Sequence, residues 1–349
     1  MRNYLTYLSL LFISTIFSCQ KHNPEGPDGL YSEGGIISFS TSVNTKAPII
    51  TEMNGRHFGV YGYAFSNLTN WNTYKTSATP NLFYRLDVYC DGANGVCSYS
   101  VDTDTDINGK EQWELNKRYA FFAYYPYSVN YGNVNYVVPS DNTQIDNPYI
   151  DYSLPFVSGA RNIDPDVLQD IMTSKVIDYS PVQGTEVRFE FDHRLFCIEL
   201  YGHNFNAEDI KISDLTMTVS GIHYNKAKIY MDSSVPTVPT SGVLNNVQFA
   251  IHPNEQTLKS GADATSMSGD KNIVLIPQNS SASGAVGLTV QIDFKKDGVS
   301  VDPRRETFYV DFIPGRKYRL TLNFIGEDVV MVVGDPAPWD SKDVNHTFN

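Results

Sequence analysis

The sequence predicts an all-β protein made of two antiparallel β-sandwich domains in series. It is rich in aromatic residues, with 23 Tyr and 19 Phe against 19% charged residues, and aromatic side chains favour half-buried pleated surfaces. Short runs of β-branched and aromatic residues follow one another along the chain, separated by clusters of Gly, Pro, Asn, Asp and Ser. With 349 residues, the chain is long enough for two such domains.

The first 18 residues have the features of an export signal. An apolar run from Leu5 to Phe17 follows Arg2, and a run of this length is too short to span a bilayer comfortably. It ends in Ile-Phe-Ser-Cys, which resembles the lipobox of bacterial lipoproteins, so residues 1–18 are expected to be a lipoprotein signal peptide and Cys19 the site of lipid attachment. The alternative is an ordinary secretory signal with an incidental cysteine.

Strand patterns begin after a polar segment. Residues 19–35 are rich in Gly and Pro and carry few apolar side chains, which predicts a flexible tether. From Ile37 to Val43 the side chains alternate as they do in a half-buried strand. Further runs of strand character lie at residues 57–65, 118–127, 187–202, 214–221, 271–278, 286–294, 307–313, 317–326 and 327–334.

One segment, residues 164–175, has helical character, because an aspartate and a proline open it in the positions of a helix cap and first turn. An extended connector is the alternative. Beyond it, Pro181 and Gly184 interrupt the pattern before the next strand run. This interruption predicts a domain boundary, with an N-terminal domain at residues 36–180 and a C-terminal domain at residues 181–349.

Charge and cysteine content limit the classes of function. The net charge of −13 argues against nucleic acid as a partner, because phosphate binding requires clustered Lys and Arg. Cys90 and Cys97 bracket a turn of Gly and Asn, so they form either a local disulfide or two reduced thiols. Cys197 lies inside a strand pattern and is expected to be a buried, unreactive side chain.

The sequence carries no pattern of a catalytic or metal site. Its seven histidines form no His-Glu-x-x-His or His-x-His spacing, and it contains no nucleophile elbow or phosphate-binding loop. The acidic run at residues 101–111 lacks the Gly and Glu spacing of a calcium loop and is expected to face water. We therefore predict a protein that is not an enzyme, with no catalytic residues, no metal and no cofactor.

Several phrases of the sequence, taken together and in order, resemble the fimbrillin family of Bacteroidetes-type lipoproteins, which includes stalk, tip and anchor subunits of fimbriae. They lie at residues 36–49, 113–128, 168–176, 187–202, 312–324 and 336–340. The resemblance implies two tandem transthyretin-like β-sandwich domains, a lipid anchor in the cell outer membrane, and assembly with other fimbrial subunits.

Assembly in such a family depends on the exchange of β-strands. A sandwich that gives up its first strand exposes a groove, which an extended segment of a neighbour can fill. Lys46 and Ala47 resemble the site at which a trypsin-like protease cuts some relatives; the alternative is a solvated loop. In the tail at residues 340–349, a candidate donor strand, three side chains alternate toward one face: Val344, His346 and Phe348. A frayed tail without function is the alternative.

The leading hypothesis is a structural or adhesive subunit of fimbriae, or an accessory protein at their tip or anchor. Its expected partners are other fimbrial subunits, the outer membrane through the lipid on Cys19, and a host or bacterial surface receptor. The alternative is a surface glycan-binding lipoprotein of a polysaccharide-utilisation system.

Overall fold

A computed structural model shows a chain that is nearly all β. It describes residues 35–338 except 44–52, 92–95, 100–110, 128, 132–133, 140–147, 156–161, 164, 182–185, 221–223, 233, 241–246, 253–254, 269–272, 280–286 and 335–336. The predicted all-β class is confirmed. Within these ranges, no helix is both long enough and apolar enough to cross a membrane.

Helical structure in the described ranges is confined to three short elements. They are α1 (Trp71–Tyr74), η1 (Lys75–Ser77) and η2 (Pro165–Val167). The segment expected to be a helix or a connector contains only the 3₁₀ turn η2, and a strand follows from Met172. The sequence analysis missed α1, although Asn70 caps it by accepting a hydrogen bond from the backbone N–H of Thr73 at 3.0 Å.

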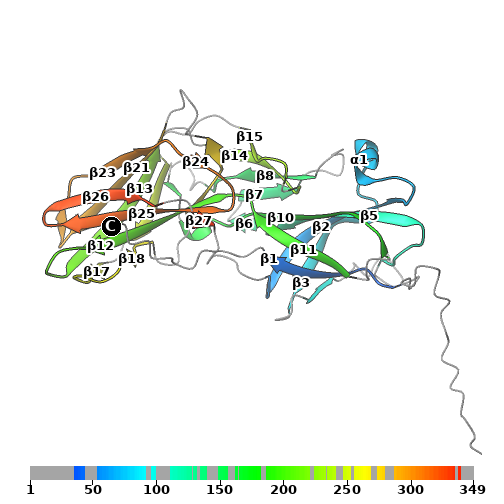
Figure 1. Ribbon diagram of the computed structural model, residues 1–349, viewed down its shortest axis with the longest axis horizontal. Helices are drawn as coiled ribbons and strands as arrows, with labels where there is room; N and C mark the ends of the chain where they lie inside the picture. Colours follow the sequence, from blue (N-terminus) through cyan, green and yellow to red (C-terminus); the bar gives the residue numbers. More distant parts are fainter. Residues whose placement is uncertain are drawn as a thin grey trace, which may run out of the picture.

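The N-terminal strands form a closed barrel, seen in the right half of Figure 1. Its order is β1 (Ser38–Val43), β11 (Glu186–His193), β10 (Met172–Tyr179), β5 (Lys117–Tyr125), β2 (Arg56–Ser66), β3 (Phe83–Cys90) and β4 (Val96–Tyr99), and β4 pairs with β1. The boundary predicted between residues 180 and 181 falls between β10 and β11, which are paired neighbours in this barrel. The position of that boundary therefore does not separate one sheet from another.

A second sheet joins segments from both sides of the predicted boundary. It contains β6 (Val129–Tyr131), β7 (Val134–Pro139), β8 (Tyr149–Ser153), β14 (Lys226–Tyr230) and β15 (Val238–Pro239). Strand β8 pairs with β14 over five residues. The chain therefore crosses between its two halves several times. That each half is a transthyretin-like domain stays a prediction.

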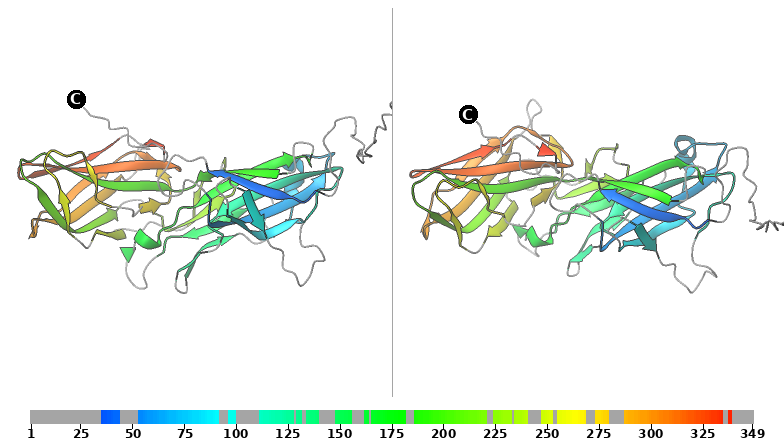
Figure 2. Two further views of the ribbon diagram at one scale, coloured as in Figure 1. Left: turned by 90° about the horizontal axis from the view of Figure 1, so that it is seen from below. Right: turned by 60° about the horizontal axis from the view of Figure 1, so that its bottom comes forward.

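The C-terminal strands form two facing sheets at the other end of the elongated molecule (Figures 1 and 2). One sheet contains β18 (Thr265–Ser266), β12 (Phe196–Asn204), β25 (Arg316–Ile325) and β26 (Asp328–Val333), with β19 (Ile273–Leu275) and β27 (Ala337–Pro338). The other contains β22 (Val299–Ser300), β21 (Leu288–Lys296), β13 (Ile210–Ser220), β16 (Val247–His252) and β9 (Asn162–Ile163), with β17 (Gln256–Leu258) and β23 (Arg304–Phe308). Strands β20 (Gln278–Asn279) and β24 (Asp311–Phe312) form a separate pair.

We predicted antiparallel β-sandwiches, but some of the strand pairs are parallel. Strand β1 is parallel to β11, β12 is parallel to β25, and β9 is parallel to β16. A period-two pattern identifies the buried face of a strand but not its direction, so no local pattern indicated these parallel pairs.

The barrel strand β5 shows how the cores are arranged. Residues Tyr119 to Tyr125 are buried on both faces of the strand. The side chains of Tyr119, Phe121, Ala123 and Tyr125 belong to the core inside the barrel, while Ala120, Phe122 and Tyr124 belong to a second core. This second core continues through the sheet of β8 and β14 into the C-terminal sandwich. The segment at residues 118–127 was expected to be a strand, and the structure buries both of its faces.

A tyrosine fixes the turn before β5. The backbone N–H of Glu114 donates to the Tyr119 hydroxyl at 2.7 Å, and the Trp113 ring packs against the Tyr119 ring with centroids 4.7 Å apart. Asn116, in the turn between them, has a φ of 62°. Asparagine tolerates this left-handed conformation better than most residues.

The same arrangement recurs before β25. The backbone N–H of Ile313 donates to the Tyr318 hydroxyl at 3.0 Å, and the rings of Phe312 and Tyr318 lie 4.6 Å apart. Here Gly315, with a φ of 67°, takes the left-handed position. The spacing from the aromatic residue to the tyrosine is the same in both turns. The two ends of the molecule therefore share one type of turn, which precedes a buried strand.

Candidate functional site

The candidate site is the first strand, β1, together with the strands that hold it in the barrel. β1 pairs in parallel with β11 along its whole length, from Ser38 opposite Glu186 to Val43 opposite Phe191. On its other side, among the described residues, it pairs with β4 at Phe39 and Ser40. Strand β1 therefore closes the barrel, and its removal would leave two walls, β11 and β4, without a partner between them.

An aromatic pocket holds the side chain of Phe39, which is fully buried. Its ring lies 5.6 to 5.9 Å, centroid to centroid, from four rings of the barrel core, and these belong to Phe83, Tyr99, Phe121 and Phe189. Ring pairs at these separations add to the stabilisation from burial alone. Phe39 is thus the main apolar anchor of β1.

The chain just before β1 is held by residues 111–113. The backbone N–H of Trp113 donates to the Gly35 carbonyl at 2.9 Å, and the Ile37 N–H donates to the Glu111 carbonyl at 2.9 Å. The Tyr99 hydroxyl also donates to the Ile37 carbonyl at 2.9 Å. Strand β1 is therefore bound through its backbone as well as through Phe39.

One wall of the site carries a disulfide. Cys90 of β3 and Cys97 of β4 are directly opposite each other in the ladder, and their sulfur atoms are bonded. Of the two alternatives open for this pair, the structure has the disulfide. The Thr41 hydroxyl of β1 lies 3.8 Å from both sulfur atoms. Because the disulfide joins β4 to β3, it holds this wall in place independently of β1.

Most of the predicted site residues lie outside the described residues. These are the lipid site Cys19, the cleavage pair Lys46 and Ala47, and the donor-strand residues Val344, His346 and Phe348. The described chain nevertheless fixes where the neighbouring segments start. β1 ends at Val43, three positions before Lys46, and β27 ends at Pro338, where it pairs with Arg316 at the start of β25.

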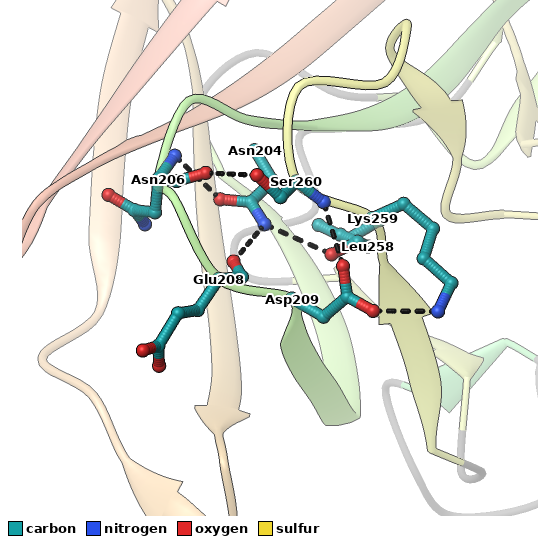
Figure 3. Close-up of polar contacts among 7 residues, drawn as sticks. All are labelled: Asn204, Asn206, Glu208, Asp209, Leu258, Lys259 and Ser260. Carbon is teal, nitrogen blue, oxygen red and sulfur yellow. Dashed lines mark hydrogen bonds and ion pairs between the residues drawn. The ribbon is translucent and has the colours of Figure 1, made fainter.

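A polar cluster, drawn in Figure 3, ties together the loops at the far end of the C-terminal sandwich. The Asn204 amide donates to the carbonyls of Glu208 at 2.8 Å and Leu258 at 3.0 Å, and its oxygen accepts from the Asn206 N–H at 2.9 Å. Asp209 accepts from the Lys259 ammonium at 2.6 Å and from the Ser260 N–H at 2.9 Å. These bonds satisfy the groups of the loop itself, so the cluster acts as a structural clamp.

Two buried pairs of ionisable side chains escaped the sequence analysis. His193 and Asp170 are bonded through Nδ1 and Oδ2 at 2.5 Å, and Lys317 and Glu199 are 3.1 Å apart. Burial raises the pKa of the Asp170 carboxyl, and His193 acts in the opposite direction. Asp170 lies 23 residues before His193 in the chain, and no local pattern connects the two residues. Cys197 is buried in β12, as predicted.

A family model and several solved structures match the chain. A family model described as fimbrillin-like matches residues 52–339. A solved fimbrial protein from Bacteroides vulgatus is 18% identical, with a TM-score of 0.62, covering 86% of this chain and 99% of the other. A candidate cell adhesion protein from Bacteroides ovatus is 13% identical, with a TM-score of 0.54, covering 89% of this chain and 100% of the other. A second one, from Bacteroides uniformis, is 15% identical, with a TM-score of 0.52, covering 87% of this chain and 99% of the other. No curated protein sequence matches the chain.

Proposed function

Because the chain belongs to the fimbrillin-like family, we propose that it is a subunit or accessory protein of cell-surface fimbriae that assembles by β-strand exchange. Its role is structural and adhesive and not enzymatic. The observation that carries the proposal is the position of β1, a single strand that closes a barrel and inserts one large aromatic anchor, Phe39, into a pocket.

Cleavage between Lys46 and Ala47 would separate β1 from the rest of the chain. After this cut, β1 would be held only by its ladders with β11 and β4, by the contacts of residues 35–37, and by the Phe39 pocket. An extended segment of a neighbour could then replace it, because the exposed walls offer unpaired N–H and C=O groups. The disulfide between Cys90 and Cys97 would keep the wall formed by β4 in position during the exchange.

The replacing segment in this proposal is the tail of a neighbouring subunit, residues 340–349. Phe348 is the only aromatic residue of this tail, and it matches the chemistry of the pocket that Phe39 vacates. Val344 and His346 would occupy the positions that the other inward-facing residues of β1 leave. Backbone pairing with β11 would supply the remaining affinity.

Lipid attachment at Cys19 distinguishes the possible places in a fimbria. A subunit that is cut after Lys46 loses the lipid together with β1, as a stalk or tip subunit would. An anchor subunit keeps both, remains in the outer membrane, and only donates its tail. Either role places the protein at the cell surface, where a receptor on a host or bacterial cell is a further partner.

The test measures polymer formation by purified, protease-treated protein with electron microscopy and a mildly denaturing gel. Phe348→Ala should abolish polymers, whereas Thr347→Ala, on the opposite face of the tail, should leave them intact. Lys46→Ala should block cutting and retain β1. Polymers that form equally well from the Phe348→Ala protein would refute the tail as donor. A stable monomer that binds oligosaccharides saturably would favour a glycan-binding lipoprotein instead.

A further inference from the structure

Strand β26 is an edge strand. Its six residues, Asp328–Val333, pair with β25 in unbroken register from Ile325 opposite Asp328 to Leu320 opposite Val333. Among the described residues, β25 is the only strand that pairs with it, and Figure 1 shows it lying beside β25. In an antiparallel ladder the N–H and C=O groups of alternate residues point away from the partner. Within the part of the chain that the structure describes, one side of β26 therefore presents a row of unpaired backbone groups.

The other described edges are short or charged. Strands β9, β15, β18 and β22 have two residues each, and β15 ends in Pro239. The longer edge strand β23, which lies close to β26 in the facing sheet, carries Arg304, Arg305 and Glu306. Short length, proline and charge are the features that protect an edge from pairing with another chain. The described part of β26 has none of them apart from Asp328 at its start.

The side chains of β26 make this edge apolar on its outer face. Val330 and Val332 are 48% and 40% exposed, whereas Val329 is buried and Met331 and Val333 pack against the core. The inward residues hold the strand in place, and the outward valines leave an uncharged surface beside the unpaired backbone. A strand with this composition and no bulge favours addition of a further strand.

The sequence of β26 is palindromic about Met331, since Val-Val-Met-Val-Val reads the same in both directions. We propose that β26 pairs antiparallel with β26 of a second copy of this chain, about a two-fold axis at Met331. In this register Val330 faces Val332 of the second copy, and Val332 faces its Val330. Asp328 faces Gly334 of the second copy, so within β26 itself no two like charges meet. The pairing is isologous and joins the sheets of the two copies, edge to edge, into one continuous sheet.

This contact is independent of strand exchange. It uses the C-terminal sandwich, whereas exchange uses β1 and its pocket in the barrel. The uncut chain should therefore dimerise through β26 even though it cannot polymerise. In a fimbria the contact would join subunits of neighbouring polymers side by side.

The first experiment measures the mass of the uncut full chain by sedimentation over a wide range of concentration. The protein carries Cys19→Ser, which removes both the lipid attachment site and the Cys19 thiol. The parent protein should form a reversible dimer. Val330→Lys with Val332→Lys places lysine opposite lysine twice and should weaken the dimer by at least about tenfold. Val330→Glu with Val332→Lys places glutamate opposite lysine twice and should restore it. A parent protein that stays monomeric, or equal dimerisation of all three proteins, would overturn the proposal.

The second experiment tests the register without changing charge. A mixture of the Val330→Cys and Val332→Cys proteins, again with Cys19→Ser, should form an intermolecular disulfide on mild oxidation. Each variant alone should crosslink poorly, because in this register its cysteine lies diagonal to that of the second copy, about 7 Å away or more. Equal crosslinking of the single variants and the mixture, or no crosslinking of the mixture, would contradict the two-fold axis at Met331.

Discussion

The Nδ1 atom of His193 lies 2.5 Å from the Oδ2 atom of Asp170, and the two side chains are 3% and 0% exposed. His193 ends β11, and Asp170 precedes β10, two strands that pair at Met172 and His193. The next residue, Arg194, donates its backbone N–H to the Ile171 carbonyl at 2.8 Å. The pair therefore fixes the point at which the chain leaves the barrel for the C-terminal sandwich.

Asp170→Asn should destabilise the protein by about 3 kcal/mol, because an uncharged amide cannot replace the carboxyl that faces the buried His193 imidazole. Chemical denaturation followed by tryptophan fluorescence measures this change.

The chain offers a matched control in His57 and Asp87, which make the same Nδ1-to-carboxylate contact at 2.8 Å with side chains 53% and 42% exposed. Asp87→Asn should cost less than about 1 kcal/mol, since exposed ion pairs contribute little. If Asp170→Asn and Asp87→Asn lower the free energy of unfolding equally, burial does not increase the contribution of the inner pair to stability.

Removing the tyrosine hydroxyl from either of the two turns should reduce the stability of the protein by a similar amount. Tyr119→Phe and Tyr318→Phe each remove a hydroxyl that accepts a backbone N–H, from Glu114 and Ile313 respectively. Each should lower the free energy of unfolding by about 1 to 2 kcal/mol. The exposed Tyr309, which is 64% exposed, provides the control, because Tyr309→Phe should change the stability little. If only one of these two substitutions lowered the free energy of unfolding, the two turns would not be equivalent.

Strand positions and buried faces could be predicted from local pattern. Residues 317–326 were expected to form a strand, and in β25 the alternating side chains of Tyr318, Leu320, Leu322 and Phe324 are all buried. Phe39 was expected in the first alternating strand, and it is buried in β1. Period-two alternation is a local property, so a single sequence reveals it.

Long-range pairing could not be predicted in the same way. Nothing near β1 indicates that it lies parallel to β11, almost 150 residues later, and nothing near His193 indicates Asp170 as its partner. The run of β-branched residues at 327–334 likewise indicated a strand but not that the strand lies at an edge. Neighbours in a sheet follow from the global topology, which only the three-dimensional structure supplies.

The disulfide should contribute measurably to stability. Closing the eight-residue loop from Cys90 to Cys97 removes chain entropy from the unfolded state worth about 2.5 kcal/mol. Changing both cysteines to serine should therefore lower the melting temperature, and a reducing agent should have the same effect on the parent protein but none on the variant. A parent protein whose melting temperature is insensitive to the reducing agent would contradict this contribution.

The last prediction concerns pH and the clamp of Figure 3. Hydrogen bonds from the Lys259 ammonium and from the Ser260 backbone N–H hold the pKa of Asp209 below its usual value. A carboxyl whose pKa is lower in the folded state stabilises the fold above its unfolded pKa of about 3.9. This stabilisation is lost as the pH falls through the folded pKa.

Asp209→Asn keeps an oxygen for the Ser260 N–H but removes the charge that faces Lys259. The parent protein should therefore be more stable than the variant at pH 7, and the difference should shrink once the pH falls below the unfolded pKa of about 3.9. Urea denaturation at a series of pH values measures the difference. Lys259→Gln is the complementary control: it removes the other charge, so its difference from the parent should shrink over the same range of pH. A difference between the parent and Asp209→Asn proteins that is the same at both ends of this range would mean that the Asp209 carboxylate does not stabilise the clamp through its charge.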